Sequence, residues 1–258
     1  AINGPVITIR KFYDTPLTIE RLIELESITA EAAEFLSRLV KSRYNIFISG
    51  GTGSGKTTFL NVLSDYIPED ERLVTIEDSA ELQLHNVSNL VRLEARMANL
   101  EGCNAVGIRD LIKASLRMRP DRIVVGEVRG AEAIDMLQAM NTGHDGSLST
   151  GHANSPKDMM TRLETMVLMG MEMPVTAIRS QISSAIDIVV HLARLRDKSR
   201  KVMQIAEVGD YIGGEVALTP LYKFVETGQD KNGKVFGKLV RQENSLIRTE
   251  KLKAAGYM

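Results

Sequence analysis

The chain has 258 residues, 43% of them hydrophobic and 25% charged, which is close to the average of soluble globular domains and excludes a disordered or fibrous protein. A formal net charge of -1 and the absence of Trp give no chain-wide signature of nucleic-acid binding, although a local basic patch stays possible. No apolar run approaches the ~18 residues that cross a bilayer, and the single Cys103 cannot form an internal disulfide.

The first part of the chain predicts a strand, a glycine-rich loop and a helix in that order. Residues 6–10 read as a strand without an earlier partner, which suggests that a longer protein precedes them. Thr29 is a suitable N-cap for a helix over residues 29–41. The next expected elements are a strand at 46–48, a helix from 56 to 67 that Pro68 ends, and a strand at 73–76.

The remainder predicts further alternation and then a change of character at Asp187. Helices and strands that alternate in this way are typical of an α/β fold with a mostly parallel sheet. After Asp187, apolar runs flank basic and glycine-containing turns, so we expect a β-rich C-terminal extension. The expected elements are helices at 108–118, 131–140, 157–168 and 175–186, and strands at 122–125, 147–149, 188–190, 203–208, 216–225 and 236–240.

The glycine-rich loop matches the P-loop pattern G-x-x-x-x-G-K-[ST] in full and lies between a predicted strand and a predicted helix. Glycines let successive backbone N–H groups turn toward phosphates at a helix N-terminus. In this pattern Lys56 reaches the β and γ phosphates of a nucleotide, and the Thr57 hydroxyl holds Mg²⁺. The nucleotide-binding candidates are Gly50, Gly51, Thr52, Gly53, Ser54, Gly55, Lys56, Thr57 and Thr58.

Two acidic residues end predicted strands at the same edge of the sheet, where a nucleotide triphosphatase needs carboxylates. Glu127 fits the Mg²⁺ side, although many P-loop enzymes place Asp there. Glu77 is the candidate for orienting or deprotonating the attacking water, with Asp78 beside it. Glu81 is open between a role near that water and an ordinary surface position.

These blocks resemble the type II/type IV secretion and pilus-assembly ATPases, and look closest to the tight-adherence pilus and conjugation-type branch. The matching segments are residues 50–58, 75–81, 116–121, 126–129 and 149–155. The resemblance implies a RecA-like P-loop core with an Asp box, an atypical Walker B glutamate and a His box. Thr150-Gly151-His152 stands where retraction-type relatives usually have Thr-Leu-His, which favours assembly or secretion over retraction.

The resemblance also implies a domain organisation and a cellular setting. We expect residues 1–28 to end an absent N-terminal domain and linker, residues 29–193 to form the core, and residues 194–258 to form the extension. The family works as homohexamers on the cytoplasmic face of the inner membrane, where ATP and Mg²⁺ power the movement of pilins or substrates. The implied partner is a membrane platform protein, and the contact with the membrane is indirect.

Histidines and arginines supply the remaining candidates. His152 is expected to sense the γ-phosphate as a neutral hydrogen-bonding group, and His144 is a second His-box candidate, whereas His85 and His191 read as core residues. Arginines often compensate transition-state charge, and some act from a neighbouring subunit. The candidates are Arg92, Arg96, Arg117, Arg119 and Arg129. A basic cluster at Arg194, Arg196, Lys198, Arg200 and Lys201 reads as a solvated turn, with an anionic lipid or acidic partner as the alternative.

The leading interpretation is therefore a Mg²⁺-dependent ATPase motor that powers pilus assembly or secretion. A ring motor that moves nucleic acid is one alternative, but the near-zero net charge and scarce aromatic residues disfavour it. A nucleotide-switched binding module with little turnover is the other, and the pair of acids at Glu77 and Glu127 favours hydrolysis.

Overall fold

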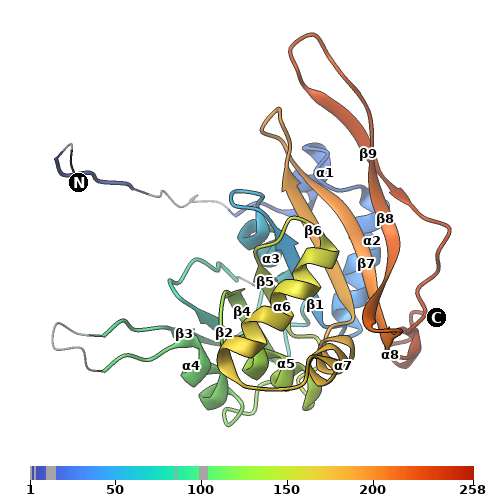
Figure 1. Ribbon diagram of the computed structural model, residues 1–258. Coiled ribbons are helices and arrows are strands. Elements are labelled where there is room, and N and C mark those ends of the chain that lie inside the picture. The colour runs from blue at the N-terminus through green and yellow to red at the C-terminus, as the bar shows by residue number, and fades with distance from the viewer. Residues whose placement is uncertain (1, 3, 10–15, 85, 99–103) are drawn as a thin grey trace.

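A single sheet runs through the molecule (Figure 1) in the computed structural model, which describes residues 2, 4–9, 16–84, 86–98 and 104–258. Within these residues the sheet has nine strands in the order β3-β2-β4-β5-β1-β6-β7-β8-β9. Their bounds are β1 Ile46–Gly50, β2 Arg72–Glu77, β3 Asn89–Glu94, β4 Arg122–Val128, β5 Leu148–Gly151, β6 Ile188–Arg194, β7 Arg200–Ile212, β8 Glu215–Gln229 and β9 Val235–Arg241.

The sheet changes from parallel to antiparallel at β6. Strands β3, β2, β4, β5, β1 and β6 pair in parallel. Strands β6 to β9 then follow as antiparallel hairpins. The predicted α/β class with a mostly parallel sheet and C-terminal antiparallel strands is confirmed, and the C-terminal strands continue the same sheet.

Helices cover both faces of the parallel part. The helices of the described residues are α1 Ile19–Glu24, α2 Ala30–Lys41, α3 Lys56–Ser64, α4 Ile108–Ser115, α5 Ala133–Asn141, α6 Pro156–Gly170, α7 Val175–Ala185 and α8 Glu250–Ala254. None of these helices combines the length and the apolar character that a membrane span requires.

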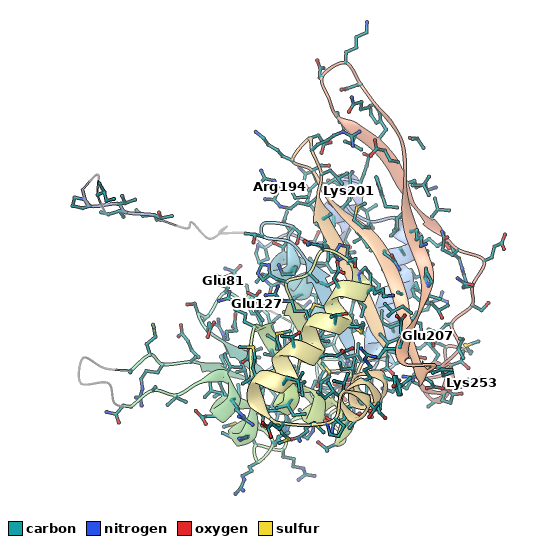
Figure 2. All side chains as sticks on the ribbon, viewed as in Figure 1. Glu81, Glu127, Arg194, Lys201, Glu207 and Lys253 are labelled. Carbon is teal, nitrogen blue, oxygen red and sulfur yellow. The ribbon has the colours of Figure 1, made fainter. Side chains whose placement is uncertain are left out.

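The C-terminal segment is fastened to the amino ends of the central strands. Glu207 of β7, labelled in Figure 2, accepts hydrogen bonds from the backbone N–H groups of Ile247 and Arg248 at 2.8 and 2.7 Å. In α8, the Lys251 Nζ lies 2.9 Å from the Asp187 carboxylate and 2.7 Å from that of Asp145. These contacts hold the last helix against the body of the sheet.

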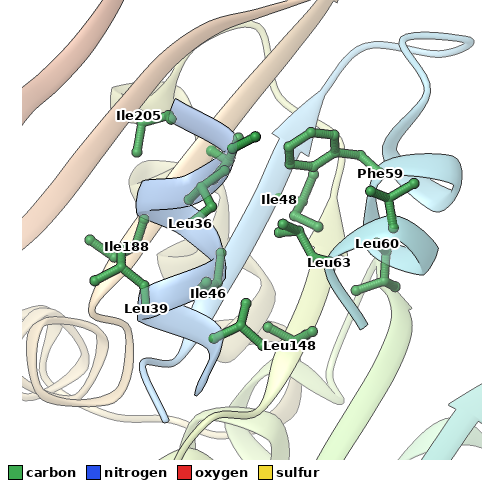
Figure 3. Close-up of a cluster of buried hydrophobic side chains, with 14 of the residues drawn as sticks. Leu36, Leu39, Ile46, Ile48, Phe59, Leu60, Leu63, Leu148, Ile188 and Ile205 are labelled. Atoms are coloured by element: carbon green, nitrogen blue, oxygen red, sulfur yellow. The ribbon is translucent and has the colours of Figure 1, made fainter. Parts of the chain in front are cut away.

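Two apolar clusters fill the space between the sheet and its helices. In β1, Ile46 and Ile48 pack toward α2 and α3, whereas Phe47 joins the cluster on the opposite face. Figure 3 shows the first cluster, where Leu36 of α2 and Leu63 of α3 lie near these isoleucines, all of them fully buried. This period-two alternation is what a strand covered on both faces requires. The packing of β1 between the two clusters holds the loop that follows it in place.

The structure departs from the sequence expectations in four elements. Residues 6–9 form no strand, and Arg10 of that predicted run lies outside the described residues. The edge strand β3 was not predicted, because only Val91 and Leu93 alternate with exposed charged residues there. Helices α1 and α8 also escaped prediction, because each is short and buries a single leucine, Leu22 or Leu252.

Candidate functional site

The carboxyl ends of four neighbouring parallel strands meet at one edge of the sheet. The P-loop (residues 50–57) leaves β1, Glu77 ends β2, Glu127 is the penultimate residue of β4, and His152 directly follows β5. Topology therefore gathers residues that are up to a hundred positions apart in the chain, as expected for an open α/β sheet.

The P-loop has the backbone shape of an anion cradle. Gly53 and Gly55 adopt φ angles of 70° and 96°, in the left-handed region that glycine tolerates, and Gly55 is the N-cap of α3. At Gly50, a Cβ atom would lie only 2.4 Å from the backbone oxygen of Leu192, so the close approach of β6 requires glycine. The buried Ser54 hydroxyl has no hydrogen-bond partner among the described residues. These features fit a ligand that accepts hydrogen bonds from the loop.

A cavity of about 780 Å³ opens over this edge. Residues 52–58 of the chain form its floor, and apolar side chains that include Phe59 and Leu192 form part of its wall. The sequence-predicted residues that line it beyond the P-loop are Glu77, Asp78, Glu81, Glu127, Arg129 and His152. The volume is within the range of small-molecule sites.

A chain of polar contacts crosses the cavity from the P-loop to β4. The Lys56 Nζ lies 3.4 Å from His152 Nδ1, and the His152 Nε2 lies 2.6 Å from Glu127 Oε1. Glu127 Oε2 in turn accepts from Arg129 Nη2 at 2.6 Å, and Arg129 Nη1 lies 3.4 Å from Asp78 Oδ2. Because an ammonium group only donates, His152 accepts at Nδ1, and in the neutral ring the proton is then on Nε2, the nitrogen beside Glu127.

Electrostatics in this chain favour a neutral histidine. Burial lowers the pKa of His152, the nearby Lys56 ammonium lowers it further, and the Glu127 carboxylate opposes both effects. Burial also lowers the pKa of Lys56, again opposed by Glu127. The hydrogen bond to Glu127 raises the pKa of Arg129. The arrangement therefore keeps one neutral imidazole between a cation and an anion.

Glu77 is held in a different way from Glu127. Its Oε2 accepts the backbone N–H groups of Glu81 and Leu82, both at 2.8 Å, which folds the loop after β2 around the carboxylate. Burial raises the pKa of Glu77, while these two N–H donors lower it. Gly126 of β4 permits the close packing, since a Cβ there would lie 3.1 Å from the Glu77 Cγ. A buried carboxyl with a raised pKa suits proton transfer near neutral pH.

Comparison with known proteins identifies the family. The model of the type II/IV secretion system protein family matches residues 1–238. This chain belongs to that family. The conjugal transfer protein TrbB of Rhizobium radiobacter is 35% identical over 81% of this chain and 62% of its own length. The type IV secretion system protein PtlH of Bordetella pertussis is 42% identical over 62% of this chain and 48% of its own length.

A solved structure of the family supports the fold. The VirB11 ATPase from the Brucella suis type IV secretion system shares 35% identity with a TM-score of 0.63, over 73% of this chain and 55% of that one. The RecA-like core that the sequence predicted is confirmed by this likeness. The chain spans less than two thirds of the length of these relatives.

Four of the candidate arginines lie outside the cavity. Arg92 of β3 donates to the backbone oxygen of Leu82 at 3.0 Å and so supports the loop around Glu77. Arg96 donates to the Asn104 backbone oxygen at 2.8 Å and forms an isolated antiparallel bridge with Val106 beyond β3. Arg117 and Arg119 also do not line the cavity. An action of these arginines on a neighbouring subunit stays a prediction.

The four histidines and the cysteine differ in position. His144 precedes β5 and bonds the Ala139 backbone oxygen at 3.2 Å, so it lies at the amino end of that strand, opposite the cavity edge. A His-box residue has to approach the phosphates, and the direction of β5 places His144 away from them, so this candidate is corrected. His191 is buried and pairs with the Ser49 hydroxyl at 2.9 Å, as a core residue would. His85 and Cys103 lie outside the described residues.

The basic turn between β6 and β7 is the part of the site that sequence reasoning missed. Lys198 and Arg200 line the cavity, and Arg200 Nε donates to the Gly53 backbone oxygen at 2.9 Å. Lys201 is buried and its Nζ donates to the backbone oxygens of Leu25 and Glu26. The sequence favours a solvated turn here, because the spacing of the basic residues does not show that β6 pairs with β1 and so lies beside the P-loop.

Proposed function

We propose that this chain is the ATPase domain of a motor that hydrolyses ATP with Mg²⁺ to power pilus assembly or protein secretion at the bacterial inner membrane. The observation that carries the proposal is the meeting of a complete P-loop, two strand-end acids and His152 on one cavity. Membership in a family that includes a type IV secretion ATPase supports the same function.

The residues have distinct roles in this proposal. Lys56 binds the β and γ phosphates, Glu77 orients the attacking water, and neutral His152 senses the γ-phosphate. Arg129 fixes Glu127 and stabilises charge at that side of the site. Lys56 also donates to the Gly51 backbone oxygen at 3.1 Å, which holds its amine beside the cradle.

The site also fits magnesium. Mg²⁺ is commonly held by one or two protein oxygens together with substrate phosphates rather than by an all-protein cage. Thr57, next to Lys56 at the start of α3, is the proposed hydroxyl ligand, and Glu127 is the proposed acid on the metal side. Glu127 Oε2 accepts from Arg129, and Oε1 lies 2.6 Å from His152 Nε2, so contact with the metal requires one of these neighbours to move. Mg²⁺ held there would supply positive charge that neutralises the phosphates.

The functional unit is proposed to be a homohexamer on the cytoplasmic face of the inner membrane. The family resemblance supports this ring, as well as an inner-membrane platform protein as partner and an indirect membrane association. Light scattering of the full-length protein with a non-hydrolysable ATP analogue is expected to give the mass of six subunits. A monomer at high protein concentration would contradict the ring.

A second candidate is a ring motor that moves nucleic acid, because the relative TrbB is named a conjugal transfer protein. The net charge of -1 and the absence of Trp argue against direct tracking along DNA. Phosphate release from ATP, measured with and without single-stranded and duplex DNA, separates the two. Unchanged rates support the secretion motor, whereas a salt-dependent stimulation of about tenfold supports the DNA motor. Tight ATP binding with no release would support the nucleotide-switched module.

A further inference from the structure

The β6–β7 hairpin places like charges next to each other. Arg194 and Arg200 are direct partners across the two strands, and Lys198 lies in the turn between them. We name Arg194, Lys198 and Arg200 the hairpin cations. Like charges directly opposite each other destabilise a strand pair, so their retention requires a compensating interaction.

That compensation does not come from carboxylates within the described residues. None of the hairpin cations forms an ion pair there, whereas the neighbouring Arg196 pairs with Glu226 and donates to Gln229 Oε1 at 2.9 Å. One arginine of the turn is thus matched by an acid, and the other two face each other without one. Figure 2 shows Arg194 and Lys201 on these two strands.

The hairpin cations lie against the P-loop. Besides its bond to the Gly53 oxygen, Arg200 has its Cδ 3.2 Å from where a Cβ of Gly55 would lie. The Arg194 Nη1 lies 4.0 Å from the corresponding position at Gly53. Lys198 and Arg200 line the same cavity as Lys56. Positive charge therefore surrounds the cradle from the hairpin as well as from α3.

The hairpin is fixed before any ligand arrives. Asp197 accepts the backbone N–H groups of Ser199 and Val235, each at 2.9 Å. The hydrogen bond from the Ser199 hydroxyl, together with these donors, lowers the pKa of Asp197 to about 2, so its charge persists at all ordinary pH values. A preformed arrangement of this kind loses little entropy on binding.

We propose that the hairpin cations, with Arg200 as the principal contact, bind the phosphate chain of the nucleotide from within the same subunit. The Nε of Arg200 positions Gly53, and its two terminal nitrogens, which have no protein acceptor among the described residues, reach the phosphate oxygens. The inference rests on the proposed function, because it assigns a further part of the nucleotide site. It predicts that this subunit supplies a guanidinium of its own in addition to any from a neighbour.

The test compares ligands that differ only in their phosphates. ATP and adenosine compete against a fluorescent ATP analogue on the wild type and on Arg200→Ala, in protein whose thermal unfolding is checked. The loss of one charge-assisted contact is expected to weaken ATP binding about tenfold and to leave the adenosine affinity unchanged. Arg200→Lys, which keeps the charge, should lose less.

Matched variants distinguish a failure of this inference from a failure of the proposed function. Arg196→Ala removes an arginine from the same turn but from outside the cavity, and it should bind ATP like the wild type. If Arg200→Ala unfolds, Lys198→Ala and Arg194→Ala provide the same comparison with smaller expected losses. Normal ATP affinity in folded Arg200→Ala, with affinity lost in Lys56→Ala, overturns this inference alone. Failure of the wild type to bind ATP overturns the proposed function itself.

Discussion

The parallel and antiparallel halves of the sheet supply the site in different ways. Strands β1, β2, β4 and β5 end at one edge, so Glu77, Glu127 and His152 meet the P-loop although they lie far apart in the chain. The antiparallel half reaches this edge through one turn, which carries Arg200 to Gly53. A parallel sheet thus gathers the chemical groups, whereas the antiparallel half adds positive charge and holds the C-terminal segment.

Substitutions in the parallel half should have the largest effects on turnover. Lys56→Ala removes the ammonium that lies between the P-loop and His152, and we expect kcat for ATP to fall by on the order of 10³-fold, comparable to the loss of a preorganised charge donor. The fold should survive, since the hydrogen bonds of the amine within the described residues go to the Gly51 backbone oxygen and to His152. Steady-state phosphate release measures kcat, and circular dichroism checks the fold. Unchanged kcat in a folded variant would contradict the site.

The two acids should differ in their response to magnesium. Glu77→Gln removes the proposed base, so turnover is expected to fall about 10²- to 10⁴-fold while ATP still binds. Glu127→Gln should also raise the Mg²⁺ concentration needed for activity, because it removes charge beside the metal. Titrations of activity with Mg²⁺ compare the variants. If excess Mg²⁺ restores Glu77→Gln and leaves Glu127→Gln inactive, the two roles are exchanged.

The free energy of unfolding should also respond differently to substitutions in the parallel and antiparallel halves of the sheet. Arg122 at the start of β4 is fully buried, bonds Glu71 through two nitrogens and donates to the Val40 backbone oxygen at 2.7 Å. Arg122→Met leaves the Glu71 carboxylate buried without its main partner, so unfolding free energy should fall by about 3–5 kcal/mol. Urea denaturation measures the change.

The exposed pair Arg196–Glu226 in the antiparallel half is the control for that measurement. Because both side chains are largely solvated, Arg196→Ala should change stability by no more than about 1 kcal/mol. A second variant, Arg122→Met with Glu71→Leu, should recover most of the loss, since no charge is left buried. Equal losses from Arg122→Met and Arg196→Ala would show that burial does not distinguish the two pairs.

The smallest effect concerns the charge of His152. Its pKa is expected below the ordinary 6.5, so the ring is neutral throughout the range above that value. Because the folded-state pKa is lowered, the contribution of this residue to stability is complete above pH 6.5 and declines as the pH falls toward the folded-state pKa. NMR titration of the imidazole measures the pKa. Glu127→Gln should lower it further, and an upward shift would contradict the contact.

Much of the parallel half could be predicted from sequence. The loop at Gly50–Thr57 carries its own signature, and the strand-end positions of Glu77 and Glu127 follow from apolar runs that stop at acids. Thr29 also predicted the start of α2, where its side chain accepts from the Ala32 N–H at 3.4 Å. These features depend on residues that are near one another in the chain.

Other features depend on the pairing of distant strands, which no local pattern reveals. The role of Arg200 follows from the position of β6 beside β1, with Leu192 pressed against Gly50. The misplacement of His144 has the same origin, because the direction of β5 decides which of its ends faces the P-loop. The edge strand β3 escaped notice because its exposed charges interrupt the apolar pattern.

The most direct test of the proposed nucleotide site is a crystal structure with Mg²⁺ and a non-hydrolysable ATP analogue. We expect the γ-phosphate to lie within hydrogen-bond distance of Lys56 Nζ and His152, and the metal to contact the Thr57 hydroxyl. A terminal nitrogen of Arg200 should contact a phosphate oxygen of the same nucleotide. A nucleotide bound away from residues 50–57, or phosphates that contact neither Lys56 nor His152, would contradict it.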